Sequence, residues 1–183
     1  MKMSKFNRLK MLGLFWLCLV FLFLAFVDCG ASRTVINKKP ESKSYNYQVV
    51  EIPDFGETDQ EWVPLDSYSE IPDMVAEELR NNNHFRKILR TKSDDSLGER
   101  ILLVQGTMTG YDRGCKYCEW YSFGINDKGK GVVYVGIQLI DKNTGLIITD
   151  ADVSGRAKDP GYGRSKYIRV TDEIVDLIQH IND

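Results

Sequence analysis

The residues best spaced for chemistry are Cys115 and Cys118, which form a C-x-x-C motif. In thiol-redox enzymes such a pair begins a helix, whose positive end lowers the pKa of the first thiol. Here the motif follows a strand-like segment, and no helical pattern lies near it. A zinc site needs two more ligands, and neither His84 nor His180 has a histidine or cysteine partner three to five residues further on. The sequence favours a local disulfide or two plain thiols, and leaves a metal site and redox catalysis as alternatives.

Three carboxylates of a predicted β-hairpin, Asp141, Asp150 and Asp152, invite a general acid–base interpretation. They occupy hairpin positions that normally face water, where carboxylates keep ordinary pKa values. The segment GYGRSK at 161–166 resembles a phosphate loop only superficially, because a Walker loop has G-x-x-x-x-G-K-[ST] after a buried strand. We therefore expect solvated carboxylates and a plain glycine turn, with no catalytic residue, metal site or cofactor.

Aromatic residues gather around a glycine-rich hairpin, at Tyr111, Tyr117, Trp120, Tyr121, Phe123 and Tyr134. Strand alternation cannot bury all of them on one face. Exposed Tyr and Trp are typical of interaction surfaces, since they combine contact area with a polar group. Packing in the core and docking of a partner both stay open. For docking, we expect Tyr117, Trp120 and Tyr121 to contact the partner.

The elements that must position these residues follow from the apolar pattern. Strands are expected at 47–52, 85–89, 100–111, 132–140 and 146–153. One helix is expected at 71–83, with Pro72 in its first turn, and a second near the C-terminus, with the apolar face Val170, Ile174, Leu177, Ile178 and Ile181. The order β-α-β-β-β-β-α predicts a two-layer α+β domain, with about five mostly antiparallel strands and both helices on one face. Only the first βα unit supplies a crossover for a parallel pair.

The N-terminal residues are predicted to form an export signal or a membrane anchor. Lys2, Lys5, Arg8 and Lys10 precede MLGLFWLCLVFLFLAFV at 11–27, which carries no charge. Such a run is at the lower edge of the roughly 17–25 residues that span a bilayer, and slightly longer than an ordinary signal core of ~7–15 residues. Because basic flanks stay inside, the rest of the chain is expected on the extracytoplasmic side of the cell or outer membrane.

Cys29, followed by Gly30, Ala31 and Ser32, resembles the start of a mature bacterial lipoprotein. The residue before it is Asp28, where a small residue is usual. Lipidation of Cys29, cleavage near Ala31 and an uncleaved anchor therefore all stay open. The domain boundaries predicted are 1–29 for the signal or anchor, 30–44 for a polar tether and 45–183 for one α+β domain.

The charge of the exported part disfavours nucleic acid as a partner. Of the 24 Lys/Arg and 26 Asp/Glu, four bases and one acid lie in the first 29 residues, which leaves the remainder with a net charge near −5. Nucleic-acid binding depends on basic contacts with phosphate, so an acidic domain does not favour it.

Several motifs resemble a bacterial family described as domain of unknown function 4410. They are IPDF at 52–55, the helix that ends in Leu79 before Phe85, LVQGT at 103–107, YDRG at 111–114 and TG at 144–145. The resemblance covers about residues 45–183 and implies an envelope lipoprotein. It also implies a fold similar to lipoproteins that activate cell-wall synthases or build secretion channels, and no known chemistry. The sequence departs from the family at 115–121 and before Cys29.

These observations together favour a non-enzymatic, membrane-anchored accessory domain that binds another envelope protein. One alternative is an extracytoplasmic thiol-redox or other enzyme that uses Cys115 and Cys118. Another is a small-ligand binder whose site is the groove between sheet and helices.

Overall fold

The computed structural model describes residues 32–41, 45–57, 63–91, 99–115, 129–158 and 164–181. It confirms the α+β class. The strands are β1 (Arg33–Lys38), β2 (Val49–Glu51), β3 (Lys87–Leu89), β4 (Ile101–Asp112), β5 (Val132–Asp141) and β6 (Leu146–Arg156), and the helices are α2 (Ser67–Asn82) and α4 (Ser165–Gln179).

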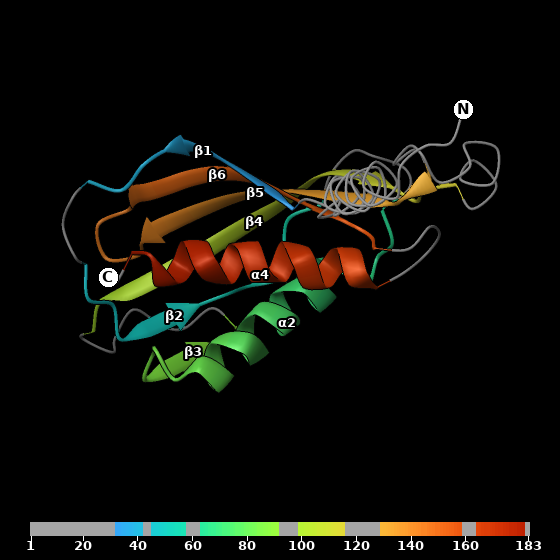
Figure 1. Cartoon of the computed structure of the whole chain (residues 1–183). Helices are drawn as coiled ribbons and strands as arrows, with labels where there is room; N and C mark the ends of the chain where they lie inside the picture. The colour runs from blue at the N-terminus through green and yellow to red at the C-terminus, as the bar shows by residue number, and fades with distance from the viewer. Residues whose placement is uncertain are drawn as a thin grey trace, which may run out of the picture. The chain divides into compact units, whose positions relative to one another are not determined.

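The strands form one sheet in the order β1-β6-β5-β4-β2-β3 (Figure 1). The β1–β6, β6–β5 and β5–β4 pairs are antiparallel. β2 runs parallel to both β3 and β4, so the parallel pairing occurs at the first βα unit, as predicted. Both helices lie in front of the sheet in Figure 1. The described elements therefore form two layers, and no described helix covers the other face of the sheet.

β1 lies where the sequence analysis places a tether, so that prediction is wrong for Arg33–Lys38. This segment pairs with β6 at the edge of the sheet, and most of its side chains are exposed. An edge strand with two solvated faces shows little alternation of apolar and polar residues, which is why the pattern missed it. The compact unit accordingly begins at Ser32 rather than Tyr45, and the strand count is six.

α2 begins four residues before the predicted start, which puts Pro72 in the second turn. Proline has no N–H for the carbonyl of Tyr68, four residues earlier. That carbonyl accepts a hydrogen bond from the backbone N–H of Phe55 instead, at 2.9 Å. The helix ends at Asn83, whose φ of 53° is left-handed.

The core lies between the sheet and the two helices. Leu79 of α2 and Leu139 of β5 are both fully buried, as predicted. Four of the five predicted apolar residues on the final helix are buried, and Leu177 is half-buried at the edge of the core. At the β5–β6 turn Gly145 has φ +71°, the left-handed conformation predicted for it.

Candidate functional site

The hairpin between β4 and β5 is closely packed where it leaves the sheet, at residues 112–115 and 129–132, which we call its root. The two strands pair as far as Asp112 and Val132, and beyond them the Cys115 N–H donates to the Gly129 carbonyl at 3.0 Å. Gly114 has φ +78°, and a Cβ there would lie 2.5 Å from the Gly129 oxygen. Only glycine lets the two arms approach this closely.

Cys115 is disulfide-bonded. Its partner lies outside the described residues, as do Cys18, Cys29 and Cys118. Pairing with Cys118 and lipidation of Cys29 therefore stay predictions. The docking residues Tyr117, Trp120 and Tyr121 also lie outside the described residues.

The structure describes two of the six clustered aromatics, and they behave differently. Tyr134 is 45% exposed on the face of β5 that points away from the helices. Tyr111 is half-buried and packs against the core. Its hydroxyl accepts a hydrogen bond from Lys166 Nζ at 2.8 Å, and the same Nζ lies 4.1 Å from the ring centroid.

Lys166 is an unexpected member of this site, because only 1% of the residue is exposed. Its ammonium group also lies 5.7 Å from the ring of Tyr167, whose hydroxyl is 3.0 Å from Ser67 Oγ. Burial raises the pKa of the Tyr167 hydroxyl. Sequence reasoning missed this cluster, although Lys166 shares the four-residue spacing of Val170 and later core positions of α4. It joins the start of α4 to the hairpin root.

Asp141 contradicts the expectation of a solvated carboxylate, because it is 2% exposed. It accepts hydrogen bonds from the Tyr47 hydroxyl at 2.8 Å and from Arg100 Nη2 at 2.6 Å. The backbone N–H groups of Asn143 and Thr144 also donate to it, each at 3.1 Å. Burial alone would raise the pKa of Asp141, but these hydrogen bonds lower it below its usual value. The carboxylate ties the turn to β2 and β4, and no described base–nucleophile pair includes it.

Asp150 and Asp152 lie on the face of β6 that points away from the helices. Asp152 is exposed, as predicted, and Asp150 is half-buried. Hydrogen bonds from Gln138 and Asn37 lower the pKa of Asp150, so the expectation of an ordinary value is wrong for this residue.

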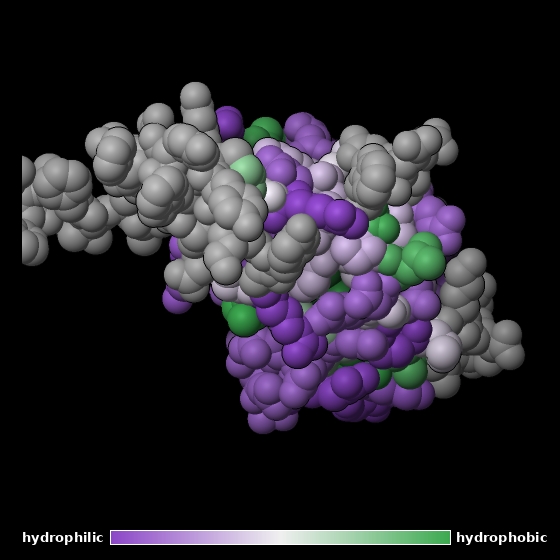
Figure 2. All heavy atoms as spheres, turned by 90° about the vertical axis from the view of Figure 1, so that its right-hand side faces the viewer, coloured by the Kyte–Doolittle hydropathy of each residue, from purple (hydrophilic) through white to green (hydrophobic). Residues whose placement is uncertain are grey.

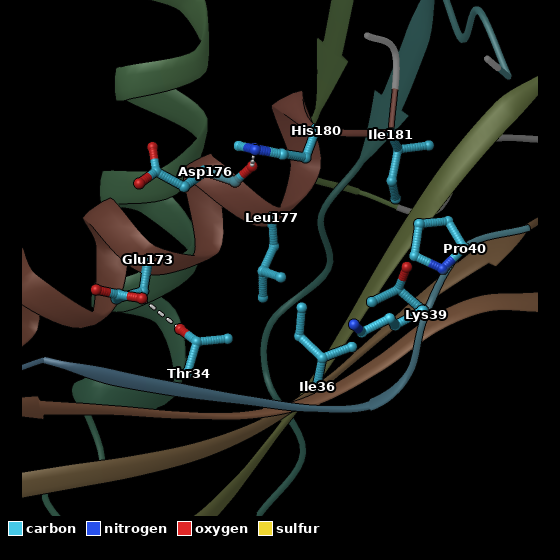
Figure 3. Close-up of a pocket in the computed structure, with 10 residues that line it drawn as sticks. Thr34, Ile36, Lys39, Pro40, Glu173, Asp176, Leu177, His180 and Ile181 are labelled. Carbon is cyan, nitrogen blue, oxygen red and sulfur yellow. Dashed lines mark hydrogen bonds between the residues drawn. The ribbon is translucent and has the colours of Figure 1, made fainter. Parts of the chain in front are cut away.

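A groove of about 320 Å³ lies between β1 and the C-terminal half of α4 (Figure 3). Ile36 and Leu177 point toward each other across it. Glu173 stands at its rim and accepts hydrogen bonds from the hydroxyls of Ser32 and Thr34. This is the groove between sheet and helices that a small-ligand binder would use.

Metal and phosphate binding find no support in the described part of the chain. No group of three His, Cys, Asp or Glu side chains there is placed to hold a metal ion. Residues 161–163 of the glycine loop lie outside the described residues, and the lysine that follows donates to Tyr111 rather than facing solvent. None of the described helices is long and apolar enough to cross a membrane, and the run at 11–27 lies outside the described residues.

Comparison with known proteins shows the fold. No family model and no curated protein matches the chain, so membership of domain of unknown function 4410 is not confirmed. Two structures of the PelC dodecamer from Paraburkholderia phytofirmans are similar at 14% and 16% identity, each with a TM-score of 0.52 and covering 83% of this chain and 98% of that one. Lipoprotein GNA1162 from Neisseria meningitidis is similar at 11% identity and a TM-score of 0.41, covering 72% of this chain and 96% of its own. The PelC structures are similar enough to establish a shared fold.

Proposed function

We propose that this protein is an extracytoplasmic, membrane-anchored accessory domain of the bacterial envelope, which binds another envelope protein and catalyses no reaction. The observation that carries the proposal is the closely packed root of the β4–β5 hairpin. Residues 116–128 connect the two arms and contain Tyr117, Trp120 and Tyr121. A clamped root holds both ends of this aromatic segment in place, which lowers the entropy cost of binding.

The root is held from three sides. Lys166 of α4 binds Tyr111 at the end of β4, and the ammonium–ring contact adds to their hydrogen bond. Gly114 permits close contact with Gly129, and the disulfide at Cys115 restricts the chain further. These contacts hold together the described residues on either side of the segment.

The side of the molecule that Figure 2 shows gives a protein partner little apolar area. Figure 2 shows mostly hydrophilic described residues on the side of the molecule to the right of Figure 1, with small separate hydrophobic patches. Protein interfaces depend on a few buried aromatic or arginine anchors. The aromatic segment at 116–128 supplies such anchors in its sequence.

The redox alternative is less well supported by the geometry. A reactive C-x-x-C thiol lies at a helix N-terminus, where the helix dipole stabilises the thiolate. Cys115 instead follows strand β4, and its N–H bonds to the Gly129 carbonyl. Rapid turnover with a dithiol substrate would favour the redox enzyme.

The test compares recovery of partners from native membranes. Tagged full-length protein is cross-linked and purified as wild type, Trp120→Ala, Tyr121→Ala and the control Glu77→Ala, which alters an exposed residue of α2. We expect Trp120→Ala and Tyr121→Ala to lose proteins that the wild type and the control retain, with an unchanged melting temperature. PelC, which shares this fold, was solved as a dodecamer, so a second copy of the chain counts among the partners.

Two outcomes would contradict the proposal. One is identical recovery from all four proteins. The other is loss of the folded domain in both aromatic variants, since a core aromatic costs roughly 3–5 kcal/mol when truncated. Tyr111→Ala serves as the comparison for such a loss, because its ring packs against the core.

A further inference from the structure

The face of the sheet opposite the helices carries an ordered array of small polar side chains. Strand register places Gln105, Gln138 and Asp150 side by side. The same register places Thr107 next to Gly136 and Asp152 in the following row, and Tyr134 next to Ser154 in the third. All point away from the helices, because alternate residues of β5, Val133, Val135, Ile137 and Leu139, are buried against them.

Hydrogen bonds fix the carboxylates of this array. Asn37 Nδ2 donates to Asp150 Oδ1 at 3.1 Å and to Asp152 Oδ2 at 3.0 Å. Gln138 Nε2 donates to Asp150 Oδ2 at 2.8 Å. Both carboxylates keep further lone pairs for a ligand. Their positions are set before any ligand arrives.

The array is hollowed on both sides of Gly136. A cavity of about 390 Å³ is lined by Arg33, Val35, Thr109, Tyr134, Asp152, Val153 and Ser154. A second, of about 230 Å³, is lined by Gln105, Thr107, Gly136, Ile137, Gln138 and Asp150. The ring of Tyr134 lies over Gly110, where an added Cβ would come within 3.0 Å of it. The two hollows follow each other along the strands, and an aromatic ring lies beside one of them. This arrangement suits an extended ligand.

The chemistry of the lining restricts that ligand. Around the two hollows the exposed large apolar side chains are Val35 and Tyr134, too few for the apolar centre of a protein interface. The apolar row beyond Gln138, which consists of Leu103, Ile140 and Ile147, is half-buried. Phosphate-rich ligands are disfavoured by the two carboxylates. A polyhydroxylated chain meets both conditions, because its hydroxyls pair with amide, hydroxyl and carboxylate groups while its C–H faces pack on a tyrosine ring.

The geometry points to an oligosaccharide site on this face, which takes a chain of neutral hexoses or N-acetylhexosamines. Asp150, Asp152 and Gln138 bind the sugar hydroxyls, and Tyr134 packs against one ring. The site includes no residue of the aromatic segment, so its test is independent of the proposed protein partner.

Calorimetric titration of the full chain in nanodiscs tests the site, with cellotetraose and tetra-N-acetylchitotetraose as probes and empty nanodiscs as a blank. We expect at least one probe to bind at millimolar concentration or below. Asp152→Ala and Tyr134→Ala should each weaken binding about tenfold, a change of about 1.4 kcal/mol. The α2 variant Glu77→Ala should bind as the wild type does.

Gly136→Thr places a side chain in the smaller cavity, which Gly136 lines, without adding a residue to the core. A Cβ at Gly136 meets Thr109 Cγ2 at 3.4 Å, an ordinary contact, so the domain should keep its melting temperature while losing the probe. Absence of binding by both probes at millimolar concentration would overturn the inference. Binding that survives the Asp152, Tyr134 and Gly136 substitutions would overturn it too. A photo-cross-linking group at position 134 provides a further check, because capture of a protein in the absence of sugar binding would also overturn the inference.

Discussion

Replacing Asp141 with alanine tests whether the buried carboxylate holds the β5–β6 turn in place. The Tyr47 hydroxyl, in a residue with no exposed surface, would lose its acceptor, at a cost of about 1–3 kcal/mol. Arg100 is about half exposed, so its ion pair adds only about 0–1 kcal/mol. We therefore expect Asp141→Ala to lower the free energy of unfolding by about 1–4 kcal/mol at neutral pH.

Tyr47→Phe is the matched partner, because it removes one donor and leaves the carboxylate its other three. It should cost about 1–2 kcal/mol, and the double variant should cost less than the sum of the two, because both remove the same hydrogen bond. Urea unfolding of a chain that begins at Ser32 measures all four free energies. Equal unfolding midpoints for wild type and Asp141→Ala, or strict additivity, would refute the network.

The same residue predicts a pH dependence. The pKa of Asp141 is lower in the folded protein than in the unfolded chain, so the unfolded state takes up the proton first. Its contribution is complete above the unfolded pKa of about 4 and is lost as the pH falls through the lowered folded value. The difference in stability between wild type and Asp141→Ala should therefore shrink below about pH 4. A difference that stays constant on acidification would show that the carboxylate's charge contributes nothing.

Three further predictions concern the core, the first strand and the N-terminus. Leu79→Ala and Leu139→Ala, both at fully buried positions, should each cost about 2–5 kcal/mol, measured by urea unfolding. A chain lacking residues 1–31 should unfold cooperatively by calorimetry, whereas one lacking residues 1–44 also loses β1 and should melt at a lower temperature or aggregate through the uncovered edge of β6. Fatty-acid labelling that disappears in Cys29→Ser would establish lipidation, and an unlabelled wild type would leave cleavage or an uncleaved anchor.

Local pattern was sufficient for the elements that bury one face. The four-residue spacing of Val170, Ile174 and Ile178 places α4, and the alternation of Val133, Val135, Ile137 and Leu139 places β5. Gly145 marks the turn because glycine adopts positive φ without steric cost. In each case the physical cause acts within one element, so the sequence of that element contains it.

Features that depend on contacts between residues far apart in the chain could be found only in the tertiary structure. β1 exists as a strand because β6, more than 100 residues later, offers it a hydrogen-bonding edge. Asp141 is a buried carboxylate because Tyr47 and Arg100 converge on it, and Lys166 is buried because the end of β4 supplies an aromatic ring and hydroxyl. The polar array on the uncovered face likewise needs the register of four strands. Composition and periodicity report which side chains prefer water, but the partners that make a buried charge or an edge strand stable are set only when the sheet assembles.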